Sequence, residues 1–419
     1  MSWVFLIVLA NRWGEWLLDR GAATRILAPP LIGRYQFGPD HGFDLLVVLI
    51  PVSVFVSVVF IPRWSQTLSF RSLIRVSPIV TATFAVALAL VSGWFWLQRP
   101  MELPGHYVND VALVRDPLDF LAGFVDRIDT YGTHVRGHPP GFMLLLWAMD
   151  RLGFAGSGWA AAVSIAGGAL AVPAVLVAVR DVAGEARARA AAPFVMIAPA
   201  ALYIATTADA LFAGVASWSV ASLVLATGRT GRRSTQLALV GGVLAGCTAM
   251  LSYGLVLMGT IPLAVAVKRR NLRPLVIGAS AALGVLAAFR VAGFDWFAGL
   301  AATRREYLES VASERPYWYF LVANLAALFV VLGPATAVGL ARLRDAKLWS
   351  IVGGGLAAVL LADVSGMSKG EVERIWLPFA MWILPAAASV ATTRRSTRGW
   401  LALQASFAAV VQLGIRTHW

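Results

Sequence analysis

Long apolar runs separated by short polar segments dominate the chain. Three of these runs, 43–61, 78–97 and 317–340, each contain roughly the 20 apolar residues that an α-helix needs to cross a bilayer. Similar runs follow one another without a soluble domain between them. Because no segment alternates between apolar and polar residues as the strands of a membrane barrel do, the pattern predicts an all-α integral membrane protein. We expect a polytopic bundle of about twelve or thirteen transmembrane helices, with a large outer loop that contains interfacial helices.

The composition and charge agree with a membrane protein and argue against two other classes. Of the 419 residues, 59% are hydrophobic and 14% are charged. The net charge of +13 does not predict nucleic-acid binding, because the basic residues are spread over short loops and form no patch. The single cysteine, Cys247, excludes a disulfide or a thiolate metal cluster within the chain, and redox chemistry is not expected.

The positions of lysine and arginine predict which loops lie in the cytoplasm. These residues gather in six loops, at 63–75, 180–189, 229–233, 268–273, 342–347 and 394–398. The positive-inside rule makes the six loops cytoplasmic. The opposite, outer side then holds 99–140, 205–209, 294–316 and 365–374, which contain many of the acidic residues. This assignment requires that 141–153 does not cross the membrane, and the short length of that segment suits a helix at the outer interface.

The first residues, MSWVFLIVLANRWGEWLL, are apolar but interrupted by Asn11, Arg12 and Glu15. They could form a first span or an interfacial helix. A cleaved signal peptide is not expected, because no basic segment precedes the apolar run and no small-residue cleavage site ends it. The role and topology of residues 1–42 stay open.

The longest outer segment, 99–140, holds the first candidate for catalysis, Asp110. A carboxylate near the outer membrane surface could take a proton from a sugar hydroxyl, as glycosyl transfer requires. The alternative is a solvated loop carboxylate, which is the ordinary state of an aspartate in a loop. The sequence pattern alone leaves both interpretations open.

The segment THVRGHPPGF, residues 133–142, predicts a basic cluster at the start of the interfacial helix. The following proline pair restricts His138 to an extended conformation. If the segment is extended, His134, Arg136 and His138 point the same way and suit a phosphate. The alternative is a helix entry with proline in its first turn and basic residues that contact lipid headgroups.

Three further groups of polar residues border the outer surface. Asp209 lies at the outer end of a hairpin, where an acid is costly unless it faces water or a partner, although it could also cap a helix. Arg374 could hold a phosphate in bidentate fashion, or it could pair with Glu371 or Glu373. The remaining basic candidates are Lys369, Arg304 and Arg305.

The order of these features resembles the GT-C membrane glycosyltransferases, and within them the branch of the protein O-mannosyltransferases and the aminoarabinose transferase of lipid A. Three elements carry the resemblance over residues 76–392, in pattern more than in identity. They are His138-Pro139-Pro140-Gly141, where the family has Lys-Pro-Pro-Leu; Ala208-Asp209-Ala210-Leu211, where it has Thr-Asp-Ala-Leu; and Arg374-Ile375 before Pro378, where it has Arg-Tyr.

The resemblance implies a polyprenyl-phosphate sugar donor, an active site on the extracytoplasmic side of the plasma membrane, and Asp110 as the catalytic base. It also implies catalytic roles for Asp209 and His138, and a lipid phosphate held by Arg374. Further binding candidates are Arg136, His134, Tyr131, Arg304, Arg305, Lys369, Glu373 and Tyr253. No metal and no other cofactor is expected, because the family's acidic pair is here Asn109-Asp110.

On this basis the chain divides into N-terminal helices with a hairpin (1–75), a catalytic module (76–392, outer loop 99–156) and a C-terminal helix (393–419). The acceptor would be a glycan, a lipid or a protein. Actinobacterial envelope enzymes, among them the methylthioxylosyltransferases that cap lipoarabinomannan, are similar in length and composition. Two other functions remain open: a transporter or lipid flippase, which predicts acids buried in mid-span, and a noncatalytic scaffold.

Overall fold

The computed structural model describes residues 2–21, 33–35, 37–39, 41–205, 207–310 and 312–417. Within these ranges nearly all regular structure is helical. The exceptions are β1 (Gly33–Tyr35) and β2 (Ile415–Thr417), which pair antiparallel and join the first part of the chain to the last. The predicted all-α fold is confirmed.

Seven helical segments of the described residues are long and apolar enough to cross a membrane. Two of them combine an α-helix with a 3-10 turn: Leu45–Thr67, which contains α2 (Leu49–Thr67), and Phe70–Ser92, which contains α3 (Phe70–Ala89). The others are α9 (Ser157–Ala183), α11 (Asp209–Thr227), α14 (Arg273–Val291), α16 (Tyr317–Arg342) and α17 (Ala346–Val364). The chain is therefore a multi-pass membrane protein.

Further helices of the bundle are shorter or more polar than these seven. They are α1 (Ser2–Asp19), α10 (Glu185–Met196), α12 (Gly231–Ala249), α13 (Thr260–Arg269), α19 (Leu377–Ile383) and α20 (Arg394–Gly414). The 3-10 helices η6 (Pro199–Tyr203) and η8 (Leu384–Ser389) follow α10 and α19, and η7 (Tyr253–Gly259) precedes α13. The total of twelve or thirteen spans stays a prediction.

Short helices fill the connections on one side of the bundle. Between α3 and α9 the chain forms α4 (Trp94–Gln98), α5 (Tyr107–Asp110), α6 (Pro117–Ala122), α7 (Thr133–Arg136) and α8 (Gly141–Arg151). Later connections contain α15 (Trp296–Glu309) and α18 (Val372–Ile375). The segment 141–153 therefore forms a helix too short to cross the membrane, as its sequence predicts.

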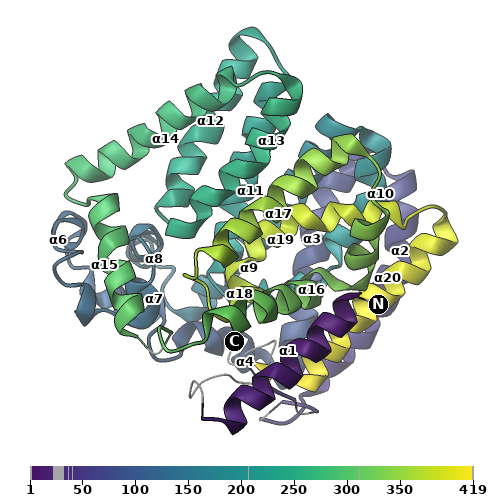
Figure 1. Cartoon of the computed structure of the whole chain (residues 1–419), viewed down its shortest axis with the longest axis horizontal. Coiled ribbons are helices and arrows are strands. Elements are labelled where there is room, and N and C mark those ends of the chain that lie inside the picture. The colour runs from purple at the N-terminus through teal and green to yellow at the C-terminus, as the bar shows by residue number, and fades with distance from the viewer. Residues whose placement is uncertain are drawn as a thin grey trace.

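Small residues let the central helices approach closely. α9 packs against α11, α11 against α12, and α12 against α14, which stand side by side in Figure 1. Gly167 of α9 faces Gly214 of α11 so closely that a Cβ on Gly214 would overlap the carbonyl oxygen of Gly167. Glycine at such contacts is a common device of membrane helix packing.

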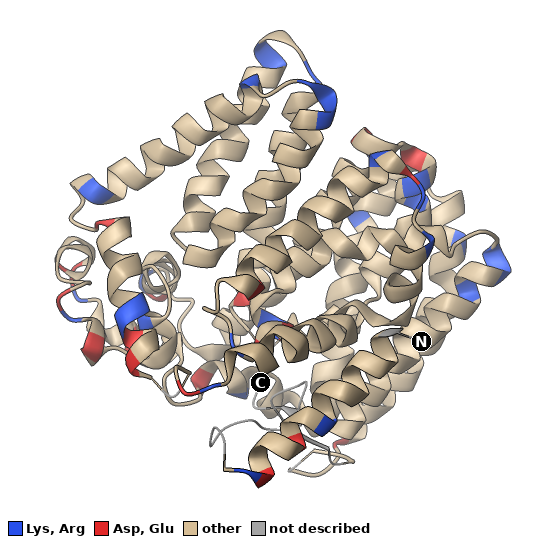
Figure 2. Cartoon of the chain, viewed as in Figure 1, with Lys and Arg blue, Asp and Glu red and all other residues tan. Residues whose placement is uncertain are grey.

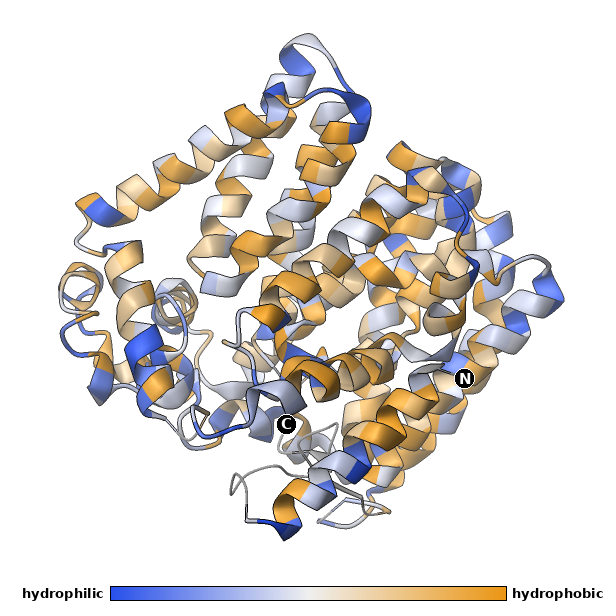
Figure 3. Cartoon of the chain, viewed as in Figure 1, coloured by the Kyte–Doolittle hydropathy of each residue, from blue (hydrophilic) through white to orange (hydrophobic). Residues whose placement is uncertain are grey.

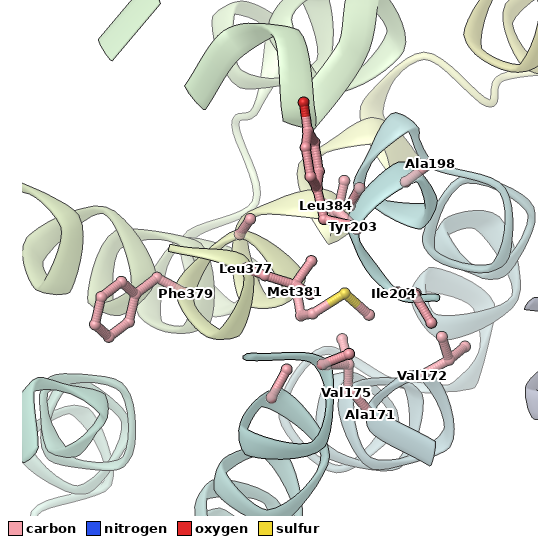
Figure 4. Packing of buried hydrophobic residues seen from close by; sticks show 14 of the residues in the cluster. Ala171, Val172, Val175, Ala198, Tyr203, Ile204, Leu377, Phe379, Met381 and Leu384 are labelled. Atoms are coloured by element: carbon pink, nitrogen blue, oxygen red, sulfur yellow. The ribbon is translucent and has the colours of Figure 1, made fainter. Parts of the chain in front are cut away.

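The apolar core lies between α9, η6 and α19. Figure 4 shows Met381 of α19 extending between Val175 of α9 and Ile204, which follows η6. All three side chains are at most 2% exposed. This packing holds α19, and with it α18, against the start of α11.

One side chain supplies the hydrogen bonds that are missing at a break in α16. Gly333 has a φ of 75°, and Pro334 follows it, so the helix loses backbone hydrogen bonds at this point. Buried Gln404 of α20 supplies both kinds of partner: its amide nitrogen donates to the Leu332 carbonyl (2.8 Å), and its oxygen accepts from the Ala335 amide (3.0 Å).

Charged residues mark the ends of the helices, whereas their middles are apolar (Figures 2 and 3). Hydrogen bonds and ion pairs bring the six basic loops to one end. The links are Arg189 to the Ser65 carbonyl (2.9 Å), Arg229 and Arg269 to Asp181 (2.6 and 2.9 Å), Arg187 to Asp345 (2.9 Å) and Arg398 to the Val59 carbonyl (3.3 Å). The positive-inside rule predicts that this end faces the cytoplasm.

Candidate functional site

A small cavity lies at the end of the bundle opposite the six basic loops. α11 shows this orientation, because it begins with Asp209 in the cavity wall and ends with Thr227, whose hydroxyl contacts Arg269 of a basic loop (3.0 Å). The wall consists of Met101, His106, Tyr107, His134, His138, Thr207, Ala208, Asp209, Phe212 and Arg374. The cavity's volume of about 10 Å³ holds about one water molecule, so a sugar enters only if the wall moves.

Asp110 fixes the fold of the outer loop instead of lining this cavity. Its carboxylate accepts a hydrogen bond from the Gly132 amide (2.6 Å), and the His134 amide donates to the Gly105 carbonyl (3.0 Å). Gly105 has a φ of 84°, which favours glycine. These contacts join the α5 segment to the start of α7, so that residues on both sides reach the cavity.

The basic cluster at 134–138 does not have the predicted geometry. Residues Thr133–Arg136 form a helical turn, not an extended segment, because Arg136 and Gly137 donate backbone hydrogen bonds to Gly132 and Thr133. Side chains four apart therefore share a face. His134 and His138 line the cavity together, whereas Arg136 turns to Glu306 of α15 (3.1 Å).

The tautomer of His138 follows from its hydrogen bond. Its Nδ1 lies 2.8 Å from the His134 carbonyl oxygen, which can only accept. Nδ1 therefore carries the proton, and Nε2 of the neutral ring keeps a lone pair. Burial lowers the pKa of His138, while the nearby Asp209 carboxylate acts to raise it.

A buried ion pair forms part of the cavity wall. Arg374 donates to the Asp209 carboxylate (2.9 Å) and also contacts Glu371; the Arg374 and Asp209 side chains are 8% and 7% exposed. Burial alone would lower the pKa of Arg374, but the carboxylates of Glu371 and Asp209 more than compensate and raise it. The guanidinium is therefore permanently charged. Glu373, the preceding residue of α18, is fully buried.

The other two histidines of the wall are neutral near pH 7. Burial, and then the charge of Arg374, lower the pKa of His106 to about 4 and that of His134 well below its usual value. Their rings lie 4.0 Å apart. A protonated pair would place two positive charges in contact with each other and near a buried arginine.

This arrangement predicts acid sensitivity. Because the pKa of His106 falls from 6.5 to about 4 on folding, the unfolded chain binds more protons between these values, and the free energy of unfolding falls as the pH falls through this window. We expect the melting temperature of the purified protein to drop from about pH 7 to about pH 5, and to drop less in His106→Gln. His41→Gln, outside the cavity, should behave as wild type; equal pH dependence in both variants would contradict this assignment.

Tyr107 offers an unused hydrogen-bonding group. Its side chain is 3% exposed, its ring packs edge to face on Phe142 (4.8 Å between centroids), and its hydroxyl has no hydrogen-bond partner among the described residues. Burial and the nearby Asp209 raise the pKa of Tyr107 well above its usual value, so the hydroxyl keeps its proton. It is a donor placed in the wall of the cavity.

The remaining predicted residues lie outside the cavity wall. Tyr131 stacks on Phe124 (5.4 Å), and Tyr253 packs against Trp296 (5.3 Å). Arg304 and Arg305 are exposed on α15. The Lys369 ammonium donates to the carbonyls of Ser313 and Arg315 (3.2 and 3.0 Å). Their binding roles stay predictions.

His106 and Tyr107 line the cavity although neither is a candidate from the sequence pattern, and for His106 the sequence does contain a signal. Only five histidines occur in the chain, and three of them, His106, His134 and His138, fall within one outer loop and then within one cavity. Tyr107 follows His106 directly. Phe212 and Thr207 have no comparable signal, because apolar and small polar residues surround them in the sequence. Among the described residues no group of His, Cys, Asp and Glu could hold a metal ion, and the expectation of a metal-independent reaction stays a prediction.

Comparisons with known proteins give distant similarities only. No family model matches the sequence, and no curated protein matches it. ArnT from Cupriavidus metallidurans, solved with undecaprenyl phosphate bound, has a TM-score of 0.46 and 13% identity, over 75% of this chain and 59% of ArnT. An oligosaccharyltransferase from Archaeoglobus fulgidus, in complex with zinc and sulfate, has a TM-score of 0.46 and 14% identity, over 81% of this chain and 53% of its own. The same enzyme tethered to an acceptor peptide has a TM-score of 0.40 and 13% identity, over 78% of this chain and 50% of its own. The chain thus spans between half and three fifths of these proteins' lengths.

Proposed function

We propose that the protein is a membrane glycosyltransferase of the GT-C type, which moves a sugar from a polyprenyl-phosphate donor to an acceptor hydroxyl at the extracytoplasmic face. The observation that carries the proposal is the meeting of His138, Asp209 and Arg374 in one cavity wall. They are separated by up to 236 positions in the sequence, and each belongs to one of the three motifs that resemble that family. Three residues so far apart in the sequence are not expected to line one small cavity by chance.

Arg374 is placed to neutralise the leaving phosphate. In the transfer, the bond between the anomeric carbon and the phosphate oxygen breaks, and negative charge develops on that oxygen. A permanently charged guanidinium in a site with little water stabilises such charge strongly. Asp209 and Glu371 orient the guanidinium, since both accept hydrogen bonds from it.

His138 is placed to act as the general base. Its Nε2 can accept the proton of the acceptor hydroxyl as the oxygen forms its bond to the anomeric carbon. The Asp209 carboxylate favours the imidazolium that results, because it acts to raise the pKa of His138. Tyr107 can donate to a sugar hydroxyl. Asp110, whose carboxylate binds the Gly132 amide, holds the loop in place.

The positions of the acids argue against the transporter and flippase alternatives. Within the seven apolar spans the acidic residues are Asp181, Asp209 and Asp363, and each lies in the first or last turn of its helix. A proton relay across the membrane requires titratable groups in mid-span. The described spans offer none.

The acceptor is a glycan, a lipid or a protein of the cell envelope, and capping of a lipoarabinomannan is the pathway to test first. Envelope glycans would be compared by mass spectrometry between wild-type cells, a deletion strain, and deletion strains that carry His138→Gln or His41→Gln. His41 is an exposed histidine stacked on Trp96, so its substitution is a matched control. We expect the deletion and His138→Gln to lack the same sugar and His41→Gln to restore it. Unchanged glycans in the deletion strain would refute the proposal.

A further inference from the structure

The segment between α17 and α18 places Arg374 in the cavity wall, and its backbone is unusual. Glu371, which contacts the Arg374 guanidinium, has a φ of 60°, a left-handed conformation that residues other than glycine rarely adopt. Its carbonyl accepts the amides of Arg374 (3.2 Å) and Ile375 (3.1 Å), and so begins α18. A strained residue persists only where its surroundings hold it.

Asn324 supplies such a hold from α16. Its side chain is 2% exposed, and both ends of its amide are engaged. The nitrogen donates to the Ser368 carbonyl (2.6 Å), and the oxygen accepts from the Gly370 amide (3.2 Å), directly before Glu371. One side chain thus fixes the segment at two backbone positions, next to the strained residue (Figure 1 shows α16 beside α18).

Asp363 orients this amide. Its carboxylate, on the last turn of α17 and 4% exposed, accepts a second hydrogen bond from the Asn324 nitrogen (2.9 Å). A carboxylate accepts but does not donate when ionised, so it specifies which end of the Asn324 amide faces α17. The amide oxygen is then directed to Gly370.

Two tyrosines bond the beginning of the segment, close to the end of α17. The Tyr307 hydroxyl donates to the Gly366 carbonyl (3.1 Å), and the Tyr317 hydroxyl donates to the Val364 carbonyl (2.8 Å). These contacts anchor the beginning of the segment. At the end that carries Glu371, the Arg315 guanidinium donates to the Lys369 carbonyl, and Asn324 bonds the backbone on either side of it, at Ser368 and Gly370.

We infer that Asn324, oriented by Asp363, is a positioning residue for Arg374. It sets the conformation of residues 368–371, and through Glu371 it sets where the guanidinium meets a phosphate. The inference rests on the proposed function for the identity of the bound group, a lipid phosphate, and on the contacts above for the positioning. Neither residue touches the cavity itself.

The test is a double-mutant cycle on binding. Affinity for farnesyl phosphate, a short polyprenyl phosphate, would be measured in detergent for the full chain with Asn324→Ala, Arg374→Lys and both changes. We expect each single change to weaken binding about tenfold, since both disturb a bidentate contact, and the double variant to bind no more weakly than Arg374→Lys. Independent, additive losses would overturn the inference.

Gln404→Ala is the matched control for Asn324→Ala. Each substitution removes a buried side-chain amide that bonds one backbone carbonyl and one backbone amide. Asn324 bonds the segment before α18, whereas Gln404 bonds the break in α16 near Gly333. We expect Gln404→Ala to lower the melting temperature and to leave farnesyl phosphate affinity unchanged. Asp363→Asn, which keeps an oxygen acceptor for Asn324, should retain affinity, whereas Asp363→Leu should lose it.

Hydrogen exchange separates this inference from the proposed function. Peptides that cover 368–376 should exchange faster in Asn324→Ala than in wild type or Gln404→Ala, whatever the protein binds. If wild-type protein does not bind farnesyl phosphate, the lipid-phosphate donor class fails, and exchange alone decides the positioning role. Unchanged exchange in 368–376 would overturn it.

Discussion

Arg374→Gln is expected to slow sugar transfer strongly and to destabilise the protein more than the loss of any exposed ion pair. Asp209 would remain buried without its guanidinium partner, and removing one member of a buried pair costs about 3 to 5 kcal/mol. Loss of the charge that faces the leaving phosphate would lower the transfer rate by about 10² to 10³-fold. Both effects can be measured, as the unfolding midpoint in detergent and as transfer in complemented membranes.

Two further variants separate stability from activity. Arg374→Gln combined with Asp209→Asn removes both charges, so most of the lost stability should return while the transfer rate stays as low as in Arg374→Gln. Arg136→Gln breaks the pair with Glu306, whose side chains are 35% and 24% exposed, and should cost no more than about 1 kcal/mol. Similar losses for Arg136→Gln and Arg374→Gln would show that burial of the Asp209 pair does not have the expected effect.

His138→Gln is expected to reduce transfer by about 10² to 10⁴-fold, because glutamine cannot accept the proton of the acceptor hydroxyl. Asp110→Asn should reduce it by less than about tenfold, since the asparagine oxygen can still accept the Gly132 amide and hold the outer loop. The initial rate of transfer by purified protein, corrected for the folded fraction, would distinguish the two.

The opposite result has a clear meaning. If Asp110→Asn removes transfer and His138→Gln does not, the base is the outer-loop aspartate that the family resemblance implies, and the cavity must rearrange to include it. His41→Gln again serves as the control for a generic loss of imidazole.

The sequence predicted the helices well wherever a span is uniformly apolar. The run 317–340 corresponds to α16, and 141–153 corresponds to α8. The run 78–97 is less accurate, because α3 begins at Phe70 and its first turns carry Arg71 and Arg75. Arginines near the end of a span reach the headgroups with their long side chains, so hydropathy alone places the start too late. The helical segment Phe70–Ser92 also ends before residue 97, because Gly93, with a φ of 92°, turns the chain.

Four residues of the cavity wall, His134, His138, Asp209 and Arg374, were predictable from the sequence, but their geometry was not. Asp209 and Arg374 each have a local signal in the sequence, yet their ion pair spans 165 positions and has none. The spacing of His134, Arg136 and His138 predicts a common direction only with the period of a strand, whereas Gly132 and Thr133 accept the hydrogen bonds of a helical turn. Because of this difference in period, Arg136 points to Glu306, whereas His134 and His138 lie on the same side. Asn324 gave no signal, because it is one polar residue in a long apolar run.

The narrowness of the cavity has a consequence for the fate of the donor. A space of about 10 Å³ admits one water molecule at most, and its walls include the bulky rings of Tyr107, Phe212 and three histidines. When the wall opens to admit a donor and an acceptor, these two occupy the volume that bulk solvent would need. Water competes poorly as a nucleophile under such conditions. Under the proposed function, the activated lipid is therefore spared from wasteful hydrolysis, and each donor molecule consumed yields one glycosidic bond.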